Sequence, residues 1–167
     1  MAQSIANQPR LSEPQRFGAR FFALLVLASV LAWAVSLPDR LGPVQRVLAG
    51  SGTSIARLTG GTGRAVGDQI SVGPLSLDIN YECTGVYVVL ILFVFLFAYP
   101  AGWPARLIGA AIGVAALTVI NILRIAFLVR IAEVAPDLFA YFHEYVWQGV
   151  FLVLVIAYAM TWVERVR

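Results

Sequence analysis

The chain has 167 residues, of which 60% are hydrophobic and 13% are charged, and its mean hydropathy is +0.82. This composition lies far outside that of soluble domains, so most of the protein surface must face lipid. The net charge of +3 comes from arginine with no lysine, and the arginines are scattered along the chain. Their scatter gives nucleic-acid binding little support.

Four apolar stretches predict membrane spans, because each is uncharged and close to the roughly 20 residues that a spanning helix needs. The runs of Leu, Ile, Val and Phe lack the alternation of barrel strands, so the spans are expected to be helices. We predict an all-α integral membrane protein with a four-helix transmembrane bundle, residues 18–163 forming one domain between cytoplasmic tails at 1–17 and 164–167. The expected spans are 18–37, 83–99, 107–128 and 146–163.

The arginines beside the outermost spans predict the orientation. Arg16 and Arg20 directly precede the first span, and Arg165 and Arg167 directly follow the last. Positive charge favours the cytoplasmic side, so both termini are expected inside. The first span could instead be a secretory signal, since Ala32-Trp33-Ala34 resembles a cleavage site. That alternative leaves the other three spans unchanged.

Two elements are expected between the first two spans. Residues 44–58 space apolar side chains in a helical pattern, which predicts an amphipathic helix on the outer surface. Gln69 to Asn80 alternates apolar and polar residues about Gly73-Pro74, which predicts a small extracytoplasmic β-hairpin. The hairpin leads into Cys83, expected at the first turn of the second span. Residues 129–145 are expected to form an outer loop.

Three residues whose side chains can take part in catalysis are predicted to reach the same membrane face. Cys83 starts the second span, Arg124 lies near the outer end of the third, and His143 precedes the fourth. A helix start favours a thiolate, and an imidazole can take the thiol proton and return it to a leaving amine. A guanidinium stays protonated and suits a carbonyl or a developing oxyanion.

Each of these residues also has a plain structural interpretation. A single cysteine among apolar residues is most often a small buried filler, and a histidine in an aromatic segment often lies at headgroup depth. Arg124 could snorkel to the interface. However, Asn121 places a second polar group on nearly the same helix face, which favours an inward-facing functional surface.

The motifs around these residues resemble those of the exosortase/archaeosortase family. The relevant segments are Tyr81-Glu82-Cys83-Thr84-Gly85, then Asn121-Ile122-Leu123-Arg124, then His143 followed by Gly149 and Phe151 in an apolar helix. The resemblance covers roughly residues 65 to 163. The short chain looks more like compact members, such as those called exosortase H, than like the long eight-span type.

The resemblance implies a cysteine transpeptidase or protease at the outer face of a prokaryotic inner membrane. It would cleave the C-terminal sorting signal of exported proteins and pass the acyl group to an unknown acceptor. Cys83 would be the nucleophile, His143 the general acid and base, and Arg124 the oxyanion holder. Four further residues are expected to contact substrate or support these three: Asn121 orienting Arg124, Gly85 allowing close approach, Glu82 and Glu144.

No cofactor or metal is implied. Cys83, His143 and Glu144 could in principle bind zinc, but their spacing matches no common ligand pattern. An alternative function is a non-enzymatic membrane assembly factor or scaffold, in which the polar residues only pack helices. A small transporter has less support, because the ionisable residues lie near the interface rather than the bilayer midplane.

Overall fold

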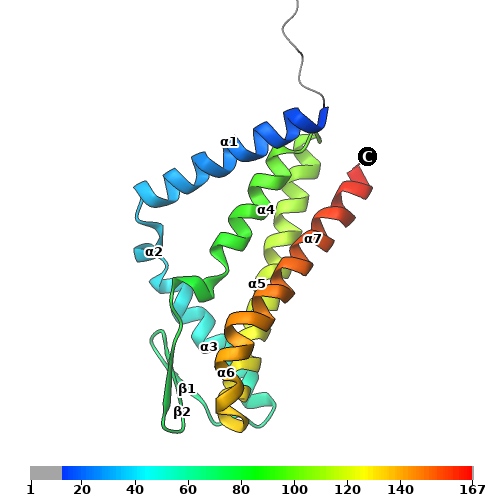
Figure 1. The fold of residues 1–167 in the computed structure, drawn as a ribbon. Helices are drawn as coiled ribbons and strands as arrows, with labels where there is room; N and C mark the ends of the chain where they lie inside the picture. Colours follow the sequence, from blue (N-terminus) through cyan, green and yellow to red (C-terminus); the bar gives the residue numbers. More distant parts are fainter. Residues whose placement is uncertain (1–12, 167) are drawn as a thin grey trace, which may run out of the picture.

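The structure is a computed structural model, and it describes residues 13–166. The chain is mostly helical, with one small antiparallel sheet between α3 and α4 (Figure 1). The α-helices are α1 (Glu13–Ala34), α2 (Leu37–Arg40), α3 (Gly42–Leu58), α4 (Val86–Ala98), α5 (Trp103–Val134), α6 (Phe139–Tyr141) and α7 (Trp147–Val166). The other elements are β1 (Arg64–Val66), β2 (Gln69–Val72), β3 (Leu75–Asp78), η1 (Tyr81–Thr84), η2 (Pro136–Leu138) and η3 (Phe142–Val146).

Three helical stretches of the described chain are long and apolar enough to cross a membrane. They are Glu13–Ala34, Trp103–Val134 and Pro136–Val166. The remaining apolar helix, α4, has 13 residues, about 20 Å at 1.5 Å per residue against a hydrocarbon core of roughly 30 Å. The protein is therefore a multi-pass membrane protein, and the four-span bundle stays a prediction.

The expected helix boundaries need correction at both ends of the chain. α1 begins at Glu13, inside the segment predicted as a tail, and α7 continues to Val166. Residues 1–12 and 167 of the predicted tails lie outside the described residues.

The outer loop predicted at 129–145 is wrong. α5 continues to Val134, and after Ala135 the chain resumes helical structure through η2, α6 and η3 into α7. The break is local, because Ala135 has φ −150° and ψ 64° and Pro136 follows it. The charged residues of this segment therefore lie on helices: Arg130 and Glu133 on α5, Asp137 on η2 and Glu144 on η3.

α3 packs tightly against α5 rather than lying free on a surface. A Cβ atom added to Gly52 would lie 2.4 Å from Ile125 Cγ2, so the missing side chain lets the two helices approach. Leu48 and Ala49 of α3 are buried in the same core as Val129 of α5. The predicted helix is confirmed, and a glycine that weakens its propensity is what makes its packing possible.

Strands β2 and β3 form an antiparallel hairpin at the predicted residues, and β1 adds a third strand in the order β1-β2-β3. The extracytoplasmic position of the hairpin stays a prediction. Ile70 pairs with Ala65 on one side and Leu77 on the other. Ile70 and Val72 are buried against the α3–α5 core. Glu133 of α5 fixes the segment that directly precedes β1. Its carboxylate accepts hydrogen bonds from the backbone N–H groups of Thr62 and Gly63 at 2.5 and 2.9 Å.

α1 has no buried residue and contacts the other helices mainly through α4. Phe17 near its start packs edge-on against Phe95 and Tyr99, with ring centroids 5.7 and 6.0 Å away. Figure 1 shows α1 crossing the end of the molecule at a steep angle to α5 and α7. The start of α1, the α4–α5 turn and the end of α7 gather at this end, and the sheet and α6 lie at the other.

Candidate active site

Cys83 lies in the short 3-10 helix η1, which follows the sheet directly. Its backbone N–H donates to the side-chain Oδ1 of Asn80 at 3.1 Å. The thiol is buried, with 6% of the residue exposed. The prediction that Cys83 occupies the first turn of the second spanning helix is wrong, since α4 begins at Val86.

Gly85 separates η1 from α4 with φ +71°, a left-handed conformation that favours glycine. A Cβ atom there would lie 3.7 Å from the Asn121 side chain, an ordinary contact. The requirement for glycine is therefore conformational, rather than the close approach expected from the sequence. The turn also removes the argument that the dipole of a long helix activates the thiol.

His143 faces Cys83 from η3, a π-helical turn of five residues that leads into α7. The His143 Nε2 atom lies 3.7 Å from the Cys83 Sγ atom. Phe139, one turn earlier, stacks on the imidazole with ring centroids 5.6 Å apart and planes 11° apart. Single π turns often occur at functional sites, where they redirect a side chain.

Arg124 is buried in α5, with 9% of the residue exposed. Its guanidinium carbon lies 5.7 Å from the centre of the Phe151 ring on α7. Its Nε atom is buried without a hydrogen-bond partner among the described residues. A buried guanidinium with unused donor capacity is well placed to hold an oxygen-bearing ligand.

The resemblance implies that Asn121 orients Arg124, but no hydrogen bond joins the two side chains among the described residues. The Nδ2 atom of Asn121 donates instead to the backbone carbonyl of Cys83 at 2.8 Å. This bond ties α5 to η1. Arg124 lies one turn further along the same helix, so α5 positions both the cysteine segment and the guanidinium.

Cys83, Arg124 and His143 line one cavity of about 180 Å³. Its other walls come from the sheet, α5 and α6, through Ile70, Ser76, Leu77, Asp78, Ile79, Ile125, Leu128, Val129 and Phe139. A second cavity, of about 410 Å³, shares Arg124 and His143 and includes Glu82 and Gly85. Glu144 is exposed and lines neither cavity.

The surroundings of the thiol shift its pKa in two opposing directions. Burial raises the pKa of Cys83 above its ordinary value, and neighbouring Glu82 adds to the increase. The positive charge of Arg124 and a hydrogen bond from the Asn80 backbone lower the pKa. Because burial is the largest of these effects, attack by sulfur requires a base that removes the thiol proton.

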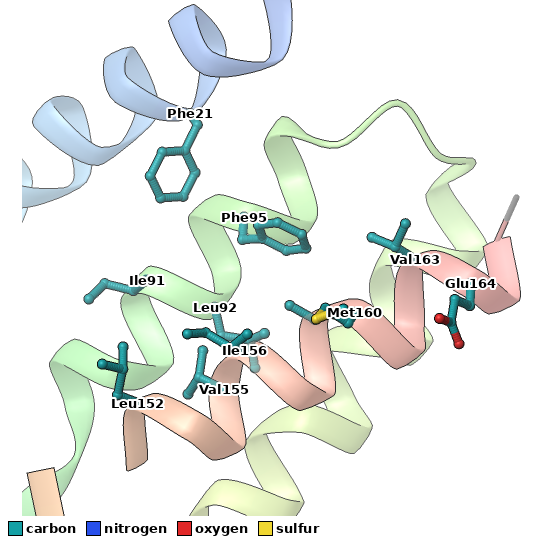
Figure 2. Close-up of a pocket in the computed structure, with 11 residues that line it drawn as sticks. Phe21, Ile91, Leu92, Phe95, Leu152, Val155, Ile156, Met160, Val163 and Glu164 are labelled. Atoms are coloured by element: carbon teal, nitrogen blue, oxygen red, sulfur yellow. The ribbon is translucent and has the colours of Figure 1, made fainter. Parts of the chain in front are cut away.

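An apolar groove continues from this site toward the opposite end of the protein. A third cavity, of about 440 Å³, lies between α4 and α7 and reaches Phe21 of α1 (Figure 2). It shares Ile91, Leu152 and Val155 with the cavity that contains Arg124 and His143. Figure 2 shows Glu164 at one end of its α7 wall. We call the two joined cavities the α4–α7 groove.

Several residues of the site had no recognisable signal in the sequence. Asn80 looked like the end of a strand, and Phe139 was one aromatic residue among many. Phe151 was part of the family resemblance but had no role assigned. Asn80 accepts a hydrogen bond from the Cys83 backbone, Phe139 stacks on His143, and Phe151 contacts the Arg124 guanidinium. Only the folded chain brings these groups together. Phe139 and His143 are four residues apart, a spacing that places two side chains on one face of a helix. This spacing was the one available signal that their rings stack.

Comparison with models of protein families found a match over most of the chain. The profile of the transmembrane exosortase family matches residues 11–163, a range that includes Cys83, Arg124 and His143. No curated protein and no solved structure gave a match. Because the match extends over most of its length, the chain belongs to the transmembrane exosortase family.

Proposed function

We propose that the protein is a cysteine transpeptidase that cleaves the C-terminal sorting signal of exported proteins and transfers the acyl group to an acceptor. Family membership supports a membrane-embedded sorting transpeptidase. The observation that carries the assignment to this site is the meeting of Cys83, Arg124 and His143 at one cavity, with Sγ and Nε2 3.7 Å apart.

The proposed reaction has two acyl-transfer steps. His143 Nε2 takes the thiol proton as Cys83 Sγ attacks the scissile carbonyl, forming a carbon–sulfur bond. The carbon–nitrogen bond then breaks, and the leaving amine takes the proton from His143. An acceptor nucleophile attacks the thioester and its proton passes to His143. The carbon–sulfur bond then breaks, and the sulfur takes the proton from His143, which restores the thiol and the neutral imidazole.

Arg124 is proposed to hold the carbonyl oxygen while it carries negative charge. The guanidinium lines both the cavity that contains Cys83 and the adjoining α4–α7 groove. Burial strengthens its interaction with a developing oxyanion, because little water competes for the charge. The base and the oxyanion holder would thus lie on the side of the nucleophile from which substrate enters.

The α4–α7 groove is proposed to hold the apolar helix of the sorting signal. From Trp147 to Glu164 it follows α7 over 18 residues, a rise of about 26 Å, close to the thickness of a hydrocarbon core. A spanning helix tends to carry basic residues at its cytoplasmic end. Glu164, which forms no ion pair within residues 13–166, would accept that charge.

The reaction is proposed to occur outside the cytoplasmic membrane of a prokaryote. The arginines next to α1 and after α7 favour that end of the protein on the cytoplasmic side. The site would then lie near the outer border, where a peptide bond just beyond a spanning helix is accessible. The acceptor nucleophile is a further component that the protein must meet there.

The direct test is isolation of the thioester. Membranes containing the tagged protein are quenched in acid, and the Cys83 peptide is examined by mass spectrometry before and after neutral hydroxylamine, which cleaves thioesters. The sequence has one cysteine, so the adduct has a unique site. We expect a hydroxylamine-sensitive peptide on wild-type protein and none on Cys83→Ala.

A non-enzymatic scaffold gives the opposite result. In that case, host proteins with C-terminal apolar helices are processed equally with wild-type protein and Cys83→Ala, and the substitution alters only expression level or partner recovery. Equal processing would defeat the transpeptidase assignment.

A further inference from the structure

The three-stranded sheet leaves one edge open beside the active site. In the order β1-β2-β3, strand β3 has β2 as its only strand neighbour within residues 13–166. No other described element packs broadly against β3, whereas β1 and β2 both contact α3. An open strand edge presents unpaired backbone N–H and C=O groups that can bind another extended chain.

The backbone groups at this edge can be assigned from the pairing. The N–H of Ile79 donates to the carbonyl of Asp68 at 2.9 Å, on the β2 side. Backbone groups alternate in direction along a strand, so those of Leu77 also face β2 and those of Ser76 and Asp78 face away. The two-residue turn at Gly73-Pro74 gives the same assignment. Within residues 13–166, no hydrogen bond reaches the outward groups of Ser76 and Asp78.

This edge forms a wall of the cavity that contains Cys83. Four consecutive residues, Ser76 to Ile79, line that cavity together with Cys83 and His143. Side chains alternate between the two faces of a strand, so a run of consecutive lining residues indicates that the strand presents its edge. Phe139 and His143 of the helical turn line the same cavity, and so does Ile70 of β2. The cavity thus lies against the β3 edge and the inner face of the sheet, next to an aromatic helical turn.

We propose that the edge of β3 binds the substrate segment next to the scissile bond as an added antiparallel or parallel strand. The inference rests on the proposed transpeptidase function and deepens it by naming how the substrate backbone is held. An extended backbone exposes each peptide bond to attack, and main-chain pairing binds it independently of side-chain identity. The residues facing Phe139 and the cavity floor then select among sequences.

Ser76→Pro tests the edge directly. Proline removes the outward N–H and leaves the groups of Leu77 that pair with β2, and proline is tolerated at such edge positions. We expect about a tenfold loss of the hydroxylamine-sensitive adduct, from the lost hydrogen bond and the obstruction of its neighbours.

Ala65→Pro is the matched control on the far edge of the sheet. Ala65 of β1 pairs with Ile70 of β2. The backbone N–H and C=O groups of Ile70 face β3, where Ile70 pairs with Leu77. The Ala65 N–H therefore faces away from β2. No β1 residue lines the Cys83 cavity. This variant should keep its adduct, and all variants should keep the wild-type rate of Cys83 alkylation by iodoacetamide. Equal adduct levels in Ser76→Pro and Ala65→Pro overturn the proposal.

A second measurement uses the substrate side and is independent of how Ser76→Pro folds. The peptide recovered from Cys83 is synthesised with an N-methyl group at successive positions and used to compete with adduct formation in wild-type protein. Strand pairing predicts loss of competition at every second position. Equal sensitivity at all positions, or at none, contradicts it.

The remaining outcomes are also decisive. If wild-type protein forms no adduct, the proposed function fails and this inference falls with it. If Ser76→Pro keeps its adduct but lowers the mass of the detergent-solubilised protein from dimer to monomer, the edge pairs two copies of the chain instead, and the substrate proposal is overturned.

Discussion

The two sides of α5 are packed in different ways. Toward α3, α5 is in close contact through Gly52 and a core that also includes Ile70 of the sheet and Cys83. Toward α7, α5 is in close contact only near its start, where Tyr158 and Trp162 of α7 donate hydrogen bonds to the carbonyls of Gly109 and Ala105. Further along, beside Arg124, the α4–α7 groove lies open. The closed side fixes where the reactive groups lie, and the open side admits a ligand.

Arg124 stands at the boundary between these two sides. Asn121, on the same helix, bonds to the cysteine segment, while Arg124 packs over Phe151 and lines the groove. Substitutions on the side toward α3 should therefore lower stability or the rate of reaction. Substitutions that line the α4–α7 groove should lower the affinity for substrate.

The largest expected effect is on chemistry. Arg124→Gln should lower the rate of adduct formation on the order of 10² to 10³-fold, the usual cost of removing an oxyanion donor. The rate is measured by quenched-flow mass spectrometry of the Cys83 peptide. Arg130→Gln is the control, since Arg130 pairs with Glu133 away from the cavity. A comparable loss in the control would remove the assigned role.

Next comes the stability of the closed side. Gly52→Ala should lower the free energy of unfolding by about 1 to 3 kcal/mol, because the new Cβ overlaps Ile125. Gly50→Ala has no atom within 4 Å of its added Cβ and should be neutral or stabilising. Unfolding in detergent, followed by circular dichroism, distinguishes them. Equal stabilities would show that α3 and α5 are not in close contact.

On the open side, Val155→Trp should fill the α4–α7 groove and raise KM about tenfold or more, while the alkylation rate of Cys83 stays unchanged. Val153→Trp lies outside the groove, with 65% of the valine exposed, and should leave KM within about twofold, as expected for a surface change. If both variants behave alike, the groove does not hold substrate.

The smallest effect is a shift of a pH profile. Alkylation requires thiolate, and burial raises the pKa of Cys83, so its alkylation rate should increase with pH to a midpoint above that of an exposed thiol. Arg124 lowers this pKa, so Arg124→Gln should move the midpoint further upward. A midpoint below the ordinary thiol value would mean that burial is not the dominant influence.

The sequence predicted the long apolar helices, the amphipathic helix before the sheet, and the hairpin, because each has a local periodicity. It also identified the family through Cys83, Arg124 and His143. It did not predict that α5 continues past residue 128, since charged residues at an interface are compatible with helix or loop. Nor could it predict the Asn121 bond to Cys83, because a contact across 38 residues has no local signature.

The Asn121 bond has a mechanical consequence for a protein that works in a bilayer. Membranes of different thickness change the tilt and depth of a long spanning helix such as α5. Since α5 carries Arg124 and also holds the cysteine segment through Asn121, the sulfur and the guanidinium would travel together when the helix tilts. Their separation would be preserved, so the reaction could tolerate changes in lipid composition that alter how deep the substrate bond sits.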